Sequence, residues 1–352
     1  MPSEITRRVE RELEHPGLAA ALSKLPASDL RSLLMDACKY RAAGIKEAAI
    51  LAIAERDPLM APSTASARDV WAFDSVAFQA ASDFDALELS PVCPFAATST
   101  LGGVSQNNVL TTIRNAEVLG DSTIALAMEA ARRRRSSRRF TGLVRLCASQ
   151  RVVRLQPFDV PGYSPHFRLF ALVSAGRDSG SFGFETVQLI EHARVYSQLF
   201  QLLRNVGFEL HKPMFEFTDM LAVGAALTDA GITRDDIHAT IRAHRLGGSQ
   251  RLLRERGVAW ESRHSLLESR VVEPLRKEFP EADFRVNQER LEGLGYYCSF
   301  ALRVLMQAPD GQIYPLADGG FTNWTARLLQ NKKERLLISG IGSEFICKTY
   351  LA

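Results

Sequence analysis

The sequence lacks the features that mark membrane, secreted and disulfide-bonded proteins. No apolar run approaches the roughly 18 residues that a membrane span needs, and the charged N-terminus has no secretory apolar stretch. The five cysteines are scattered, form no CxxC pair and are odd in number, which indicates reduced thiols rather than a disulfide framework or a zinc site. These absences predict a cytoplasmic protein without a membrane partner.

The common catalytic and phosphate-binding motifs are absent as well. No GxGxxG follows an expected strand and no GxxxxGK[ST] occurs, so neither common phosphate loop applies. There is no GxSxG elbow, and the seven histidines show no metal-ligand spacing, so catalytic serine chemistry and a metal site have no local support. The formal net charge of +3 is too small to predict a nucleic-acid partner.

The composition that remains is that of an ordinary globular protein, with 46% apolar and 24% charged residues. Residues 1–69 indicate an N-terminal helical region and linker, because Ser28 and Asp29 can cap a helix and residues 58–69 are rich in Pro, Ser and Ala. Residues 70–352 indicate a second unit, with a helical insertion at about 210–280.

The second unit predicts an α+β fold, a mainly antiparallel sheet flanked by helices, because its strands are not separated by regular βαβ units. Extended stretches are expected at 86–89, 151–155, 167–174, 297–307 and 336–341. Helices are expected at 70–83, 121–135, 185–205, 218–229, 233–245 and 263–278.

The densest charge feature is a run of six arginines, namely Arg132, Arg133, Arg134, Arg135, Arg138 and Arg139. One interpretation is a docking patch for RNA or another acidic partner. The other is the solvated end of the helix that begins at Asp121, because cations are favoured near the unpaired carbonyls of a helix C-terminus. The sequence leaves both open.

Residues 151–178 predict an antiparallel hairpin with a long Pro/Gly-rich connection. Arg154 precedes the connection and Arg168 follows it, so an anion could be held between them; an exposed arginine pair on a sheet is the alternative. Farther along, a strand over 313–317 is expected to lead to Gly319 and Gly320 and then to a helix over 323–329. Glycines after a strand permit a ligand to approach the backbone closely.

The order of these segments resembles the catalytic core of a class II histidyl-tRNA synthetase. Residues 84–92 (FDALELSPV) resemble motif 1, which builds the dimer interface in that family, and 153–167 resemble motif 2, with Arg154 at the arginine of its opening FRYE. Residues 117–135 resemble the LRPEGTA element and the helix after it, and residues 292–297 (EGLGYY) resemble RGLDYY. Residues 316–324 (LADGGFTNW) resemble AGGRYD, and residues 340–345 (GIGSEF) resemble motif 3, GxGxER. The likeness covers residues 84–347 and implies a class II synthetase-like sheet.

The departures from the family fall where it keeps its arginines. Phe345 stands at the motif 3 arginine, Glu292 at the arginine of RGLDYY, and Phe321 at that of AGGRYD. The motif 2 loop, GRYRQF in the family, becomes GYSPHF over residues 162–167, with Pro165 among the altered positions, and so loses two more basic groups. Because arginines neutralise the phosphates of ATP during adenylate formation, the resemblance implies that ATP-dependent histidine activation is lost. It implies a ligand less anionic than ATP, or none.

The end of the chain suggests a particular relative. The synthetase carries an anticodon-binding domain after motif 3, whereas this sequence ends about seven residues beyond it. It thereby resembles the regulatory subunit of ATP phosphoribosyltransferase, which uses the synthetase fold to sense histidine and regulate a partner enzyme. The expected function is a catalytically degenerate, regulatory or ligand-binding subunit of histidine biosynthesis, without a cofactor and dimeric through residues 84–92.

Two alternatives stay open. One is an enzyme that activates an amino acid or another carboxylate with ATP and Mg²⁺ for transfer to tRNA or a carrier. The other is an RNA-associated scaffold that uses the arginine run. By resemblance, the ligand-binding residues would be Arg154, Gln156, Arg168, Tyr296, Tyr297, Gly319 and Gly320. Because neighbouring residues of a strand face opposite sides, at most one of the two tyrosines is expected to face the ligand.

Overall fold

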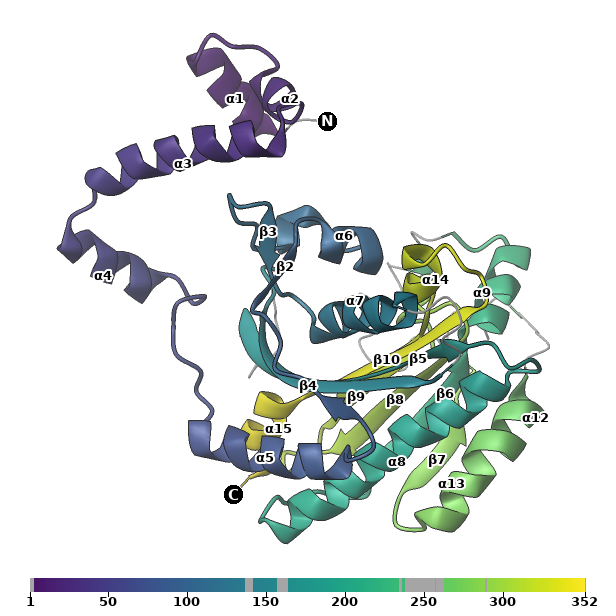
Figure 1. The fold of residues 1–352 in the computed structure, drawn as a ribbon. Helices are drawn as coiled ribbons and strands as arrows, with labels where there is room; N and C mark the ends of the chain where they lie inside the picture. Colours follow the sequence, from purple (N-terminus) through teal and green to yellow (C-terminus); the bar gives the residue numbers. More distant parts are fainter. Residues whose placement is uncertain are drawn as a thin grey trace.

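A computed structural model describes residues 3–136, 142–156, 164–233, 236–237, 257, 263–288 and 290–351. Its centre is an eight-stranded sheet in the order β1-β4-β5-β10-β9-β8-β6-β7 (Figure 1). The strands are β1 (Asp85–Ala86), β4 (Val144–Val153), β5 (His166–Arg177), β6 (Met214–Asp219), β7 (Asp283–Val286), β8 (Phe300–Gln307), β9 (Ile313–Thr322) and β10 (Glu334–Gly342). All neighbours are antiparallel except β1 with β4 and β6 with β7, which confirms the α+β expectation.

Helices cover both faces of this sheet (Figure 1). One face packs against α5 (Ala67–Ala80), α8 (Gly183–Asn205) and α15 (Ser343–Tyr350), with Phe73, Leu199 and Phe215 in the shared core. The other face packs against α7 (Ser122–Arg135), with Ile124 and Leu146 in a second core. The remaining elements of the body are β2 (Val92–Pro94), α6 (Ala97–Gly102), a 3₁₀ turn (Gln106–Asn108), β3 (Ala116–Val118), α9 (Met220–Asp229), α12 (His264–Leu267), α13 (Glu273–Glu278) and α14 (Trp324–Leu328).

The N-terminal segment stands apart from this body in Figure 1. It comprises α1 (Glu4–Glu12), α2 (Leu18–Leu22), α3 (Ala27–Ala43) and α4 (Glu47–Arg56). The first three of these helices contain no buried residue. Helices of this length gain most of their stability from packing, so this segment adds little to the core.

The structure confirms the hairpin of residues 151–178, since β4 and β5 pair with Arg151 opposite Arg168. Three expectations need correction. The strand expected at 313–317 continues to Thr322, so Gly319 and Gly320 lie within β9 rather than after it. The strand expected from 297 begins at Phe300. The range 210–280 is not wholly helical, because β6 belongs to the main sheet.

The helix expected at 233–245 falls almost entirely outside the described residues. The helix expected at 263–278 is present as α12 and α13, joined by a π-helical turn over Glu268–Val272. Within the described part of the chain, no helix is long and apolar enough to cross a membrane.

Candidate functional site

Two adjoining cavities open beside the middle of the sheet. The first, of about 350 Å³, lies between the start of α7, the end of β4 and the loop before β8. The second, of about 330 Å³, lies between β5, β8, β9 and the start of α15. Both are lined by Arg154, Leu169, Asp318 and Gly340, so they form one continuous candidate site.

Five of the seven residues expected to bind a ligand lie at these cavities. Arg154, Gln156, Tyr296 and Tyr297 line the first cavity, and Arg154 and Arg168 line the second. Gly319 and Gly320 lie outside both linings, and other parts of the chain pack closely against them. A Cβ at Gly319 would lie 2.4 Å from the Ser339 Cβ, and one at Gly320 would lie 2.5 Å from the Tyr297 ring.

Both tyrosines line the first cavity, so the expectation that only one would do so is wrong. The alternation rule does not apply because Tyr296 and Tyr297 lie in a turn, where both backbone amides donate to the carbonyl of Gly293. Their rings meet edge to face with centroids 4.9 Å apart. Burial raises the pKa of both phenols, and Asp121 and Asp318 raise it further, so both stay neutral hydrogen-bond donors.

The Arg154 guanidinium is held at the mouth of the first cavity by the turn that precedes α7. Its Nε donates to the carbonyl of Gly120 at 2.9 Å, and its Nη2 lies 3.3 Å from Asp121. Asp121 also caps α7, because its Oδ1 accepts from the amide of Thr123 at 2.9 Å. The start of α7 thus positions both a carboxylate and a guanidinium.

Arg168 points to the helix layer at the edge of the second cavity. Its Nε lies 2.8 Å from Asp74 of α5 and 2.9 Å from the Ser149 hydroxyl. Burial raises the pKa of Asp74, although Ser149 and Arg168 act in the opposite direction. Arg154 and Arg168 therefore each have a carboxylate partner of their own. They do not form a pair of free cations that could hold an anion between them.

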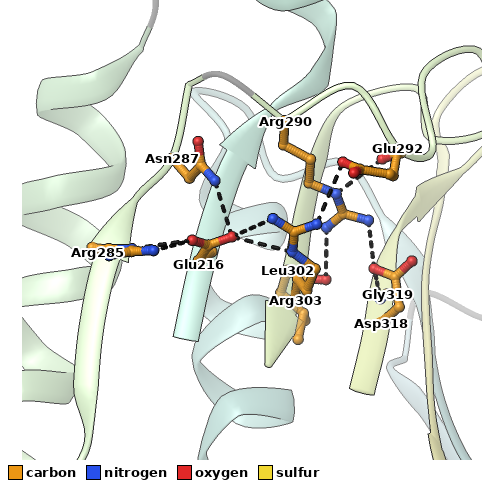
Figure 2. Close-up of polar contacts among 9 residues, drawn as sticks. All are labelled: Glu216, Arg285, Asn287, Arg290, Glu292, Leu302, Arg303, Asp318 and Gly319. Carbon is orange, nitrogen blue, oxygen red and sulfur yellow. Dashed lines mark hydrogen bonds and ion pairs between the residues drawn. The ribbon is translucent and has the colours of Figure 1, made fainter. Parts of the chain in front are cut away.

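Sequence reasoning missed a row of charges that crosses the sheet beside the second cavity (Figure 2). The strand register places Arg285 of β7, Glu216 of β6, Arg303 of β8 and Asp318 of β9 opposite one another in turn, so that the signs alternate. Glu216 is 1% exposed and accepts from Arg285, Asn287 and Arg303 at 2.5–3.1 Å.

Arg290 contacts Asp318 at the end of this row of charges, as Figure 2 shows. It is fully buried, and its Nη2 donates to the Asp318 Oδ1 at 2.5 Å. Its remaining donors reach the carbonyls of Glu292 at 2.9 Å and Leu302 at 3.1 Å. The Glu292 carboxylate lies 3.4 Å from Arg303 on the other side.

The second cavity is therefore less depleted of basic groups than the sequence suggested. Four arginines and one lysine line it, namely Arg154, Arg168, Arg290, Arg303 and Lys348. Each arginine is paired with a carboxylate of the chain. Among the described residues, Lys348 has no such partner. The positive charge of the arginines is present but already neutralised, so a polyphosphate that binds them would have to compete with four internal carboxylates.

The four altered motif positions do not all lie in the site. Glu292 and Phe345 line the second cavity, where the Phe345 ring packs edge to face on Tyr314 at 5.1 Å. Phe321 instead points into the main core and contacts Phe184. Pro165 closes the hairpin, where its carbonyl accepts from the Arg154 amide at 2.7 Å.

The arginine run is not a single exposed patch. Arg134 is 1% exposed at its side chain and binds Glu334 of β10, so its inclusion in a docking patch was wrong. Arg132 and Arg133 pair with Glu129 of the preceding turn. Arg135 is exposed, and Arg138 and Arg139 lie outside the described residues. Within the described ranges, no group of three or more potential metal ligands is present.

The structure is similar to solved structures of one fold. An ATP phosphoribosyltransferase regulatory subunit/histidyl-tRNA synthetase from Bacillus halodurans superposes with a TM-score of 0.58 and 11% identity, over 80% of this chain and 78% of that one. A histidine–tRNA ligase subunit from Alicyclobacillus acidocaldarius superposes with a TM-score of 0.58 and 12% sequence identity, over 83% of this chain and 95% of that one. A histidyl-tRNA synthetase from Nostoc sp. PCC 7120 superposes with a TM-score of 0.56 and 12% sequence identity, over 83% of this chain and 74% of that one.

No protein-family model and no curated protein sequence matches the chain. The similarity to the solved structures therefore shows the fold, and the class II synthetase-like architecture expected from the six sequence elements is confirmed.

Proposed function

We propose that this chain is a ligand-binding, regulatory paralogue of the histidyl-tRNA synthetase fold that does not form aminoacyl adenylates. The observation that carries the proposal is the internal pairing of every arginine that lines the second cavity. Adenylate formation needs cations that are free to neutralise charge as it develops on the phosphates. Arginines held by carboxylates, with Phe345 beside them, do not meet that need.

The first cavity suits a small zwitterion such as an amino acid. Arg154 can face a carboxylate group, and Asp121 and the two phenols can face an amino group. A volume of about 350 Å³ lies at the lower end of the range for small-molecule sites. The proposed role is therefore to bind an amino acid without converting it to an aminoacyl adenylate.

An assay of amino-acid-dependent exchange between ATP and pyrophosphate tests this role. We expect no exchange above background for any of the twenty amino acids, because the paired arginines cannot stabilise the transferring phosphoryl group. An active histidyl-tRNA synthetase in the same assay is the control. Robust exchange with any amino acid would overturn the proposal in favour of a carboxylate-activating enzyme, the alternative for which Arg154 and Arg168 remain at the site.

The proposed partner is an ATP phosphoribosyltransferase. Its support is the fold similarity to a structure described as a regulatory subunit of that enzyme. Co-purification of the chain with a phosphoribosyltransferase from the same organism, and a change in that enzyme's response to amino acids when the chain is added, would test this partner directly. The same proposal includes a cytoplasmic location.

A homodimer is part of the proposal as well. Residues 84–92 include β1, the edge strand of the main sheet, which pairs with β4 and leaves its other side without a strand among the described residues. Light scattering at micromolar concentration should give about twice the 39.0 kDa mass of one chain. Charged replacements at Val92, the first residue of β2, and at Phe95, just after β2, should shift that mass toward the monomer if the segment that continues from β1 is the interface, because these side chains are 41% and 49% exposed.

A further inference from the structure

Of the described residues, Asp318 is the one carboxylate that lines both cavities, and the sequence analysis assigned it no role. It lies in β9 directly before Gly319, at the position where the AGGRYD element has alanine. Its side chain is 49% exposed, although the arginine that holds it is fully buried. A charged residue here is therefore presented to the cavity rather than to the core.

The contacts of Asp318 fix one of its oxygens and leave the other open. Oδ1 accepts from Arg290 at 2.5 Å and from the Gly319 amide at 2.9 Å. Every hydrogen bond that Asp318 makes within the described residues falls on Oδ1. Because Arg290 is itself held by two backbone carbonyls, the carboxylate is oriented by a rigid support. Oδ2 is free to accept from a ligand.

The surroundings of Asp318 favour a cation. Among the described residues, the first cavity has two carboxylates in its lining, Asp121 and Asp318, against one guanidinium, that of Arg154. Arg154 is already paired with Asp121, and Arg290 contacts Asp318 through Oδ1, so the Oδ2 of Asp318 is the carboxylate oxygen left for a cation. The rings of Tyr296 and Tyr297 form the adjacent wall, and aromatic faces attract cations.

We propose that Asp318 is the specificity-determining residue of the site and that Arg290 is its positioning residue. Together they select an amino-acid-like ligand that carries a second cationic group, such as an ammonium, guanidinium or imidazolium, at the end of its side chain. The proposal rests on the proposed ligand-binding function and adds the chemical class of the ligand. Arg154 would take the ligand's carboxylate and Asp318 its distal cation.

Calorimetric titration of the full chain with matched pairs tests this selection: arginine against citrulline, lysine against norleucine, and histidine as a third cationic side chain. At least one cationic compound should bind about ten- to hundredfold more tightly than its neutral partner, the range of a hydrogen bond to a charged group. Asp318→Asn and Asp318→Ala should reduce that ratio to about one while changing the affinity for the neutral partner only about threefold or less. Asp283→Asn, which removes a negative charge from the edge strand β7, should keep the ratio.

The outcomes separate this inference from the proposed function. If neutral and cationic partners bind equally, or if both Asp318 variants keep the cationic preference, the inference is overturned while ligand binding stands. If none of the compounds binds, the ligand-binding function falls and this inference falls with it. Thermal unfolding of each variant identifies any loss of affinity that comes from loss of the fold.

Discussion

Replacing Glu216 with alanine should lower the free energy of unfolding by about 3–5 kcal/mol, the cost of breaking a buried ion pair by removing one partner. Glu216 is 1% exposed and is the common acceptor for Arg285, Asn287 and Arg303. Its removal would leave the Arg303 guanidinium, which is 7% exposed, with Glu292 as its one remaining carboxylate among the residues that the structure describes. Urea unfolding followed by circular dichroism measures the change.

A matched control separates this effect from the loss of any surface carboxylate. Glu209→Ala removes an exposed glutamate ahead of the same strand, and it should change the free energy of unfolding by less than about 0.5 kcal/mol. A double-mutant cycle of Glu216→Gln with Arg303→Met should show coupling of more than about 1 kcal/mol, because the two side chains share two hydrogen bonds. A loss below about 1 kcal/mol for Glu216→Ala would contradict a buried role for the cluster.

The same carboxylate gives the protein a defined acid sensitivity. Burial by itself would raise the pKa of Glu216, but the Arg303 and Arg285 guanidinium groups and the Asn287 amide hold it below the usual value of 4.5. A folded-state pKa below the unfolded value contributes stability that is complete above the unfolded pKa and is lost as the pH falls through the folded one. Glu216→Gln should therefore flatten the decline in stability below about pH 4.5.

Part of the sheet could be predicted from the sequence because strands such as β5 and β10 are local patterns, whereas β6 lies in a range that was expected to be helical and no strand was expected at β7. β4 and β5 are apolar stretches joined by a Pro/Gly-rich connection, and their antiparallel pairing follows from that order. The charged row could not be predicted in the same way, because it depends on register between strands far apart in the chain. Glu216 and Arg303 are separated by 87 positions and become neighbours only when β6 pairs with β8.

The sequence did contain a signal for these charges. Glu216 lies between two phenylalanines and Arg303 between leucine and valine, so each is a charged residue flanked by apolar neighbours within its strand. Charged residues are almost never fully buried unless they are paired, so two such positions in one sheet indicate an ion pair. Arg290 gave no comparable signal, since it stands in a polar loop and is buried by contacts with Asp318, Leu302 and the Tyr297 ring that only the folded chain provides.

Gly319→Ala should destabilise the protein by about 1–3 kcal/mol, the usual cost of forcing extra atoms into a packed core. The added Cβ would lie 2.4 Å from the Ser339 Cβ and 2.6 Å from the Ile338 carbonyl oxygen, so β9 and β10 would have to separate locally. Gly342→Ala is the matched control, because a Cβ there meets its nearest neighbour, Phe345, at 3.8 Å, an ordinary contact. It should be nearly neutral in the same urea titration.

The comparison with Gly320→Ala decides what the glycine pair is for. A Cβ at Gly320 would lie 2.5 Å from the Tyr297 ring and would push it toward the first cavity, so this variant should lose ligand affinity as well as stability. Gly319→Ala should lose stability with a smaller change in affinity, because its obstacle is β10. If either glycine instead bound the ligand through its backbone, alanine there would weaken binding without changing the unfolding midpoint. That result would support the ligand-binding role expected from the sequence. Loss of stability in both variants, with loss of affinity mainly in Gly320→Ala, would instead show that the two glycines allow Tyr297 and Ser339 to pack closely against β9.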